Sequence, residues 1–259
     1  MVPVSSIITI TVNAILGIAV PAFLAWYLMR KHNARLSSIV IGAVTFILFA
    51  LVLESLMHQL VLKGPYGANI MGKTLYYALY GGLAAGIFEE TGRFLSMKFL
   101  MKKEPSKQLP GIAYGVGHGG AEMLIIFGKT MINNRLISAL INSGQADSIF
   151  AKVPEEAAGQ LQAQLDQLQT LGAGTLLIGL WERFSALLLH LGLSLLVWVA
   201  VRKGGKWLWL FPAAIVLHAI VDAGAVLLQK SAGMVTLELI VMAEAIAVAA
   251  IGYMVAKKL

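Results

Sequence analysis

The chain has 259 residues, of which 58% are hydrophobic and only 13% are charged, against roughly 25% charged residues in ordinary globular proteins. So few charges cannot keep such a chain dispersed in water, so the composition excludes a soluble domain and indicates an integral membrane protein. The absence of cysteine excludes disulfides, thiolate metal ligands and a cysteine nucleophile. The net charge of +7 fits cationic cytoplasmic loops, and no nucleic-acid partner is expected.

Seven mostly apolar runs are long enough to cross a bilayer, which takes about 20 helical residues. In chain order the runs are residues 6–29, 37–62, 74–97, 110–128, 171–200, 207–228 and 232–256. No Lys or Arg precedes Arg30, so the first run lacks the basic start of a cleavable leader. The sequence therefore predicts an all-α, polytopic membrane protein that forms a single integral membrane domain over residues 1–259.

One polar stretch interrupts this pattern at residues 132–170. Pro154-Glu155-Glu156 is typical of a helix start, and Leu161, Leu165 and Leu168 recur at helical spacing. The stretch is therefore predicted to be an extracytoplasmic insertion containing one amphipathic helix outside the bilayer.

Positive charges predict the orientation. Twelve Lys and Arg residues follow the first, third, fifth and seventh runs, whereas six lie in the loops on the other side. Because cytoplasmic loops are enriched in Lys and Arg, the N-terminus is expected outside and the C-terminus in the cytoplasm of a multi-pass cell-membrane protein.

The predicted spans contain an unusual number of ionisable side chains. Burying one acid at a helix centre costs about 2.5 to 3.5 kcal/mol even on mild scales, so these groups demand protons, pairing, water or a metal cation. Against only two arginines, Arg93 and Arg183, the spans hold eight of the thirteen acids: Glu54, Glu89, Glu90, Glu122, Glu182, Asp222, Glu238 and Glu244. Four of the five histidines join them: His58, His118, His190 and His218.

Four of these residues fall at one depth. Counted at about 1.5 Å per residue from the cytoplasmic helix ends, Glu90, His118, His190 and His218 all lie about 12 to 18 Å into the bilayer. Neutral imidazoles and a carboxylate bind Zn²⁺, and a carboxylate can accept a proton from water. The shared depth predicts a metal or general-base site.

Spacing along each helix adds partners to this site. Arg93 follows Glu89 by four residues and Glu90 by three, so it can pair with one acid while the other faces elsewhere. Glu122 and Asp222 each follow a histidine by four residues. Such an acid can be a second ligand or can accept the imidazole N–H and fix its tautomer.

Simpler interpretations stand beside these. The glycines around His118 suit close helix packing, and Glu89 with Arg93 can be a purely structural pair. The more distant acids suit a structural polar network or a water-filled vestibule; they are Glu54 with His58, Glu182 with Arg183, Glu238 and Glu244.

The combined pattern resembles the YhfC family of intramembrane metalloproteases, part of a wider group that includes the CAAX prenyl endoproteases. The resemblance covers residues 74–228 and is carried by four motifs in order: Glu89-Glu90-Thr91-Gly92-Arg93, Gly117-His118-Gly119-Gly120-Ala121-Glu122, Glu182-Arg183 followed by His190, and His218-Ala219-Ile220-Val221-Asp222. Two residues rather than three separate the acid pair from Arg93, and Asp222 stands where Asn is common in the wider group. These departures favour the YhfC branch and argue against a prenylated substrate.

The resemblance implies a role for each matched residue. It makes Glu90 the base that activates water, with Glu89 and Arg93 as its positioning pair, and it makes His118 and His218 metal ligands. With the spacing, it gives a catalytic set of Glu89, Glu90, Arg93 and Glu122, and a metal set, with zinc as the expected ion, of His118, His190, His218 and Asp222.

The expected function is therefore an intramembrane endopeptidase that hydrolyses peptide bonds of a membrane-associated peptide or protein, from a mid-membrane site that opens toward the cytoplasm. Two other functions stay open. The same acids and histidines suit a proton- or cation-coupled transporter, although repeated halves are not visible. A non-catalytic membrane scaffold would keep the polar cluster without metal or hydrolysis.

Overall fold

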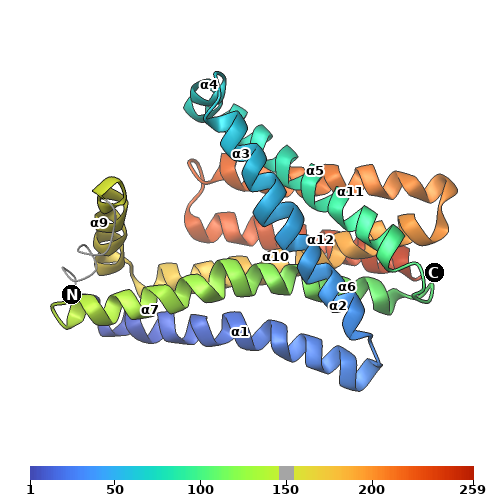
Figure 1. The fold of residues 1–259 in the computed structure, drawn as a ribbon, viewed down its shortest axis with the longest axis horizontal. Helices are drawn as coiled ribbons and strands as arrows, with labels where there is room; N and C mark the ends of the chain where they lie inside the picture. Colours follow the sequence, from blue (N-terminus) through green and yellow to red (C-terminus); the bar gives the residue numbers. More distant parts are fainter. Residues whose placement is uncertain (146–154) are drawn as a thin grey trace. The chain divides into compact units, whose positions relative to one another are not determined.

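The computed structural model describes residues 1–145 and 155–259, and these residues form helices joined by short connections, without a strand among them (Figure 1). Pro154 lies outside the described residues. In chain order the elements are α1 (Val4–His32), α2 (Leu36–Phe46), η1 (Ile47–Glu54), α3 (Ser55–Leu62), α4 (Gly67–Gly72), α5 (Thr74–Leu100), α6 (Gln108–Glu122), η2 (Met123–Gly128), α7 (Lys129–Asn142), α9 (Glu155–Thr170), α10 (Ala173–Lys203), η3 (Gly205–Trp209), α11 (Leu210–Leu228) and α12 (Met234–Ala256).

The helices confirm an all-α, polytopic membrane protein. Within the described ranges, six helical segments are long and apolar enough to cross a membrane: Val4–His32, Leu36–Leu62, Gln108–Asn142, Ala173–Lys203, Gly205–Leu228 and Met234–Ala256. The remaining predicted run lies in α5, which has 27 residues and is therefore about 40 Å long. Its buried charges Glu89, Glu90 and Arg93 make α5 less apolar than the six.

The chain divides into two compact units. Unit 1 comprises Met1–Val20 and Met123–Arg183, and unit 2 comprises Pro21–Glu122 and Phe184–Leu259. The division falls inside α1 and α10, so each of these helices contributes to both units.

Unit 1 is held together by hydrogen bonds from α1 to the segment that begins α10. Ser6 Oγ donates to the carbonyl of Leu171 at 2.7 Å, and Asn13 Nδ2 donates to that of Leu176 at 2.7 Å. The helical run that starts at Gln108 continues to Asn142, beyond the end predicted at residue 128. In α7, Asn134 and Ser138 are buried, at 8% and 0% exposure, whereas most other polar residues of this helix are exposed.

The amphipathic helix predicted in the polar stretch is α9, also in unit 1. Leu165 and Leu168 are 3% and 2% exposed, whereas most residues between and beside them face solvent. The leucine spacing therefore identified the packed face of this helix.

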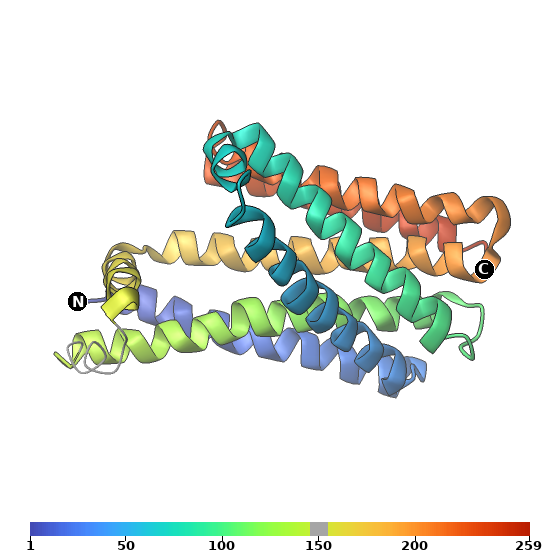
Figure 2. The ribbon, with the colours of Figure 1, turned by 45° about the horizontal axis from the view of Figure 1, so that its top comes forward.

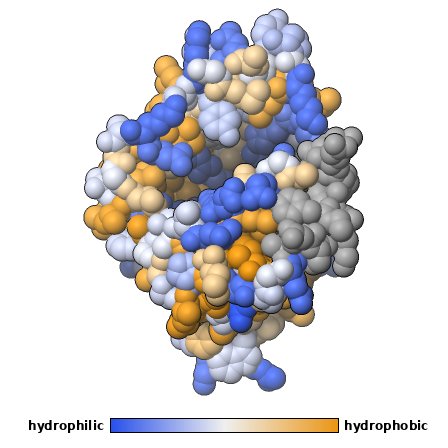
Figure 3. All heavy atoms as spheres, turned by 90° about the vertical axis from the view of Figure 1, so that its left-hand side faces the viewer, coloured by the Kyte–Doolittle hydropathy of each residue, from blue (hydrophilic) through white to orange (hydrophobic). Residues whose placement is uncertain are grey.

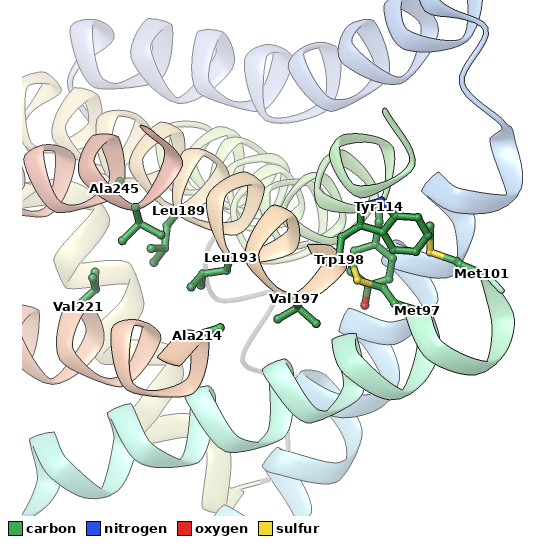
Figure 4. Close-up of a cluster of buried hydrophobic side chains, with 11 residues drawn as sticks. Met97, Met101, Tyr114, Leu189, Leu193, Val197, Trp198, Ala214, Val221 and Ala245 are labelled. Carbon is green, nitrogen blue, oxygen red and sulfur yellow. The ribbon is translucent and has the colours of Figure 1, made fainter. Parts of the chain in front are cut away.

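Unit 2 is built from two closely packed helix pairs, α5 with α11 and α2 with α6, seen from two directions in Figures 1 and 2. The second half of α10 supplies the core, and its residues 192–200 are all buried. Trp198 is 0% exposed and donates its indole N–H to the carbonyl of Lys107 at 2.8 Å. The apolar cluster around it is shown in Figure 4 and consists of Met97, Met101, Tyr114, Leu189, Leu193, Val197, Trp198, Ala214, Val221, Ala245 and Val248.

Two glycines allow the helices of unit 2 to approach closely. A Cβ atom on Gly117 of α6 would lie 1.9 Å from the carbonyl oxygen of Ile39 on α2. A Cβ atom on Gly82 of α5 would lie 2.5 Å from the carbonyl oxygen of Ala219 on α11. The first contact allows α6 to approach α2 closely, and the second allows α11 to approach α5 closely. Both α6 and α11 carry polar residues near these contacts.

Outward-facing positions of the helices carry large apolar side chains. Examples are Val44, Ile87 and Val216, which are 54%, 49% and 53% exposed. In Figure 3, apolar residues in orange are interspersed with hydrophilic residues in blue on the face shown. Exposed apolar surface of this extent suits contact with lipid tails.

Candidate metal and catalytic site

Helix α5 carries three charged side chains into the interior of unit 2. Glu90 and Arg93 are 0% exposed and Glu89 is 7% exposed. A charge buried in a low-dielectric interior is strongly destabilising unless it has a partner. Helices α6, α10 and α11 provide the partners.

Glu90 is the centre of an ion-pair network. Arg93 Nη1 donates to both carboxylate oxygens of Glu90, at 2.6 and 2.7 Å. His218 Nδ1 on α11 lies 2.9 Å from Glu90 Oε1. One turn further along α11, Asp222 Oδ2 lies 3.5 Å from His218 Nε2, and its side chain is 40% exposed. The network therefore connects a fully buried guanidinium to a partly exposed carboxylate.

Glu89 faces two other helices. Its Oε2 lies 2.8 Å from His118 Nε2 on α6 and 3.9 Å from His190 Nδ1 on α10. The three residues are buried, and one ligand atom from each lies within 4.8 Å of the other two. Two imidazoles and one carboxylate form an established zinc ligand set. These three residues are the candidate metal ligands.

His190 connects the two groups. Its Nδ1 lies 3.0 Å from Arg93 Nη2, and its Nε2 lies 2.6 Å from Glu122 Oε2. A guanidinium only donates, so Nδ1 is the acceptor and Nε2 carries the proton. The Glu122 carboxylate beside Nε2 favours this tautomer electrostatically, and in it the Nδ1 lone pair is available.

The charges and donor atoms of this cluster fit a divalent cation. The cluster contains three carboxylates: Glu90 pairs with Arg93, Glu89 with His118, and Glu122 with His190. Among these described ion pairs, Arg93 is the one permanently charged cation. A divalent cation would offset the excess negative charge. The lone pair of His190 Nδ1 cannot accept from Arg93 and bind a metal at once, so a bound metal requires Arg93 Nη2 to release it.

The structure corrects one pairing that the resemblance implied. Arg93 binds Glu90, three residues before it, rather than Glu89, four residues before it. Both spacings place the partners on one helix face, but here the Glu89 carboxylate is taken up by His118. Arg93 therefore positions the second acid of the pair, and the first faces the histidines.

The predicted residues divide between neighbouring parts of one cluster. His118 and His190 lie together with Glu89. His218 and Asp222, predicted as ligands with them, fall outside that three-residue group, although the His218 ring lies 5.4 Å from the ring of His190. The shared depth thus indicated that the histidines lie close together. It did not indicate which histidine contacts which carboxylate.

Two aromatic residues that the sequence did not single out enclose His118. Phe46 meets the imidazole edge-on, with 5.3 Å between ring centroids, and Tyr114 stacks on it at 6.0 Å. Ser96 Oγ donates to the Tyr114 hydroxyl at 3.1 Å. An aromatic residue one turn before His118 is a weak signal, because core aromatics share the same spacing.

A second polar cluster adjoins Asp222. A cavity of about 420 Å³ lies among α3, α5 and α11, and Glu54, His58, Tyr80 and Asp222 line part of it. His58 Nδ1 lies 2.8 Å from the Tyr80 hydroxyl, and His58 Nε2 lies 3.2 Å from Glu54 Oε1. Glu54 with His58 was interpreted as a structural network or vestibule. Tyr80 was missed, because its spacing does not distinguish it from the other tyrosines of α5.

The Glu182-Arg183 motif is not part of this cluster. In unit 1 the two adjacent side chains form an ion pair with each other.

Comparison with known proteins agrees with these features. The model of the family described as YhfC intramembrane metalloprotease matches residues 16–247. The chain is 36% identical over 232 residues to "Uncharacterized membrane protein YhfC" of Bacillus subtilis (strain 168), a match that covers 89% of this chain and 88% of the relative. No solved structure matches the chain. The protein therefore belongs to the YhfC intramembrane metalloprotease family.

Proposed function

We propose that the protein is a membrane-embedded, metal-dependent endopeptidase that hydrolyses a peptide bond of a membrane-associated peptide or protein. The observation that carries the proposal is the buried group of Glu89, His118 and His190, whose ligand atoms lie within 4.8 Å of one another among membrane-spanning helices. Such a group is costly inside a bilayer, so a functional role explains it better than packing does.

Glu89, His118 and His190 would hold the metal, and zinc is the ion that best suits these donors. A bound zinc ion supplies a water molecule of lowered pKa and polarises the substrate carbonyl. The Glu122 carboxylate, whose Oε2 lies 2.6 Å from His190 Nε2, would favour the tautomer needed for binding through its negative charge.

Glu90 is the proposed proton acceptor. Its carboxylate is not one of the three candidate ligands, but it lies next to them. Arg93 bridges the two, since it contacts Glu90 through Nη1 and the ligand His190 through Nη2. His218 provides a second hydrogen bond that holds the Glu90 carboxylate in place. Glu90 would take a proton from water as the oxygen attacks the carbonyl carbon, and would then deliver it to the departing amine.

The orientation of the site follows from the loop charges. The cavity at Asp222 includes Leu62 and Val226, near the ends of α3 and α11, so it lies toward the loop at residues 63–73. The positive-inside rule places this loop outside, with the N-terminus outside and the C-terminus in the cytoplasm. We therefore favour access to the site from the outer side of the membrane, in place of the cytoplasmic opening expected from the sequence.

Metal content and hydrolysis of detergent-purified protein test the proposal together. The wild type should contain about one zinc per chain by plasma mass spectrometry, and the His118→Ala/His190→Ala variant should contain none. The wild type should also cleave members of a quenched-fluorescent peptide library, and Glu90→Gln should lose at least about 100-fold in rate with its zinc retained. Normal cleavage by Glu90→Gln would refute the role of Glu90.

Wild-type protein without metal or hydrolysis, but with potential-driven cation uptake after reconstitution, would instead support the transporter. Glu89→Gln serves as the matched comparison to Glu90→Gln, because the two acids are adjacent in sequence. It should lose zinc and hydrolysis together, since Glu89 is a proposed ligand and Glu90 is not.

A further inference from the structure

The cavity at Asp222 is large enough for part of a ligand and is not occupied by the protein's own side chains. Its volume of about 420 Å³ lies within the range of small-molecule sites, roughly 300 to 1,000 Å³. Asp222 belongs both to its wall and to the ion-pair network that reaches Glu90 through His218. A group bound in the cavity would therefore lie beside the proposed hydrolytic site.

The wall of the cavity carries two acidic side chains. Glu54 and Asp222 are its two carboxylates, and the described lining residues include no Lys or Arg. His58 contacts Glu54 through Oε1, and His218 contacts Asp222 through Oδ2. In the described part of the chain, Glu54 Oε2 and Asp222 Oδ1 have no hydrogen bond. Carboxylate oxygens that face a cavity without Lys or Arg favour a cationic ligand, and a guanidinium can bind two oxygens at once.

Aromatic residues form another part of the same wall. Tyr77 and Tyr80 both line the cavity, and His58 holds the Tyr80 hydroxyl at 2.8 Å. The face of a tyrosine ring attracts a cation, with a gain that increases when the cation is desolvated. Carboxylates with tyrosine rings therefore suit a charged side chain that also brings an apolar stem.

Small residues leave the space open. Gly81, Gly82, Ala85 and Ala225 occur on the wall. A Cβ atom on Gly81 would meet no heavy atom within 4 Å, so at this position the cavity could be filled by a larger side chain without displacing a neighbour. The absence of a side chain at Gly81 keeps room beside the carboxylates.

We propose that this cavity is a specificity subsite that binds the cationic side chain of an arginine or lysine in the peptide substrate. The inference rests on the proposed peptidase function and names the substrate feature that the enzyme selects. The two carboxylates would recognise the charge, the tyrosines would contact the stem, and the scissile bond would lie on the Glu90 side of Asp222.

Binding of two matched peptides tests this subsite without requiring hydrolysis. The probes are fluorescein-labelled, acetylated Ala-Leu-Arg-Leu-Ala and the same peptide with citrulline, which has the shape of arginine but no charge. In fluorescence anisotropy with detergent-purified protein, the arginine peptide should bind at least about tenfold more tightly. The Glu54→Gln/Asp222→Asn variant should reduce this preference to less than about twofold.

Two glycine substitutions test whether the peptides need the open volume of the cavity. Gly81→Leu should fill the cavity and weaken binding of both peptides at least about tenfold. Gly224→Leu introduces the same side chain into another open position, on α11, that does not line the cavity, and it should bind both peptides as the wild type does. Zinc content should be the same in all of these proteins.

The outcomes separate the subsite from the peptidase. Equal binding of the two peptides, a preference that survives in the double variant, or no binding of either peptide at millimolar concentration would overturn the subsite. Cleavage of library peptides without preference for arginine or lysine would overturn the subsite and keep the peptidase. A charge preference in binding without hydrolysis of any peptide would overturn the peptidase and keep a cation-binding cavity.

Discussion

Two polar clusters of unit 2 use the same side-chain types in opposite surroundings. The buried cluster consists of Glu89, Glu90, Arg93, His118 and His190, and its side chains are between 0% and 10% exposed. The cavity cluster consists of Glu54, His58, Tyr80 and Asp222, and it reaches 33% side-chain exposure at His58 and 40% at Asp222.

The difference in access to water separates what each cluster can do. In the buried cluster each charge depends on a specific partner, so its geometry is rigid and suits metal binding and proton transfer. In the cavity cluster water can replace a lost partner, so its groups can exchange partners with a ligand. Acidic and histidine side chains would therefore serve the proposed chemistry in the buried cluster and the proposed recognition in the cavity cluster.

Removing the cation of the buried cluster should have the largest effect. Arg93→Met leaves Glu90 buried with only His218 as a partner, and breaking a buried ion pair typically costs about 3 to 5 kcal/mol of unfolding free energy. Titration of the purified protein with sodium dodecyl sulfate, followed by tryptophan fluorescence, would measure this loss. Adding Glu90→Gln to Arg93→Met should restore part of it, because the unpaired charge is gone.

A loss of less than about 1 kcal/mol for Arg93→Met, the range of exposed pairs, would contradict the comparison. It would mean that water reaches Glu90 as readily as it reaches the cavity cluster.

A pair of glycines compares the packing around the two clusters. Gly117→Ala, beside His118, places a Cβ atom 1.9 Å from the Ile39 carbonyl oxygen, and overpacking of this kind costs about 1 to 3 kcal/mol. Gly81→Ala at the cavity meets no atom within 4 Å, so it should be neutral or gain about 0.5 to 1 kcal/mol from helix propensity.

The same detergent titration measures the stability of both glycine variants. Their zinc content reports whether His118 keeps its position. Gly117→Ala should also lower zinc occupancy, because separating α2 and α6 shifts His118 away from Glu89. Equal stabilities of the two variants would show that the α2 and α6 contact does not position the metal group.

The sequence predicted the helices of this fold well because the bilayer constrains them strongly. Each of the seven apolar runs lies on a helix of the structure, with ends within a few residues except at the fourth run. That run continues to Asn142 through α7, whose residues are mostly exposed at their polar positions although Asn134 and Ser138 are buried, a mixture that composition alone assigns to a loop. Apolar length is therefore a reliable guide, and polarity at a span end is not.

The sequence predicted which side chains lie close together, but not how they pair. Depth counted along straight helices brought Glu90, His118, His190 and His218 to one level, and the structure places them in one cluster. Partner choice depends on rotation about each helix axis, and π-helical segments alter that rotation. The segment η1 ends at Glu54, so the α-helical spacing before it does not give the direction of that side chain.

The smallest expected effect belongs to the cavity cluster. Tyr80→Phe removes the hydroxyl that lies 2.8 Å from His58 Nδ1 and leaves the ring on the wall. Because the His58 side chain is 33% exposed, water can take the place of the hydroxyl. The free energy of unfolding should therefore fall by at most about 0.5 to 1.5 kcal/mol, with zinc content unchanged. The detergent titration and mass spectrometry used for Arg93→Met apply directly. A loss of unfolding free energy as large as that of Arg93→Met, or a fall in zinc content, would contradict the comparison. It would show that the cavity cluster and the buried cluster form one rigid network, which leaves no groups free to bind a ligand.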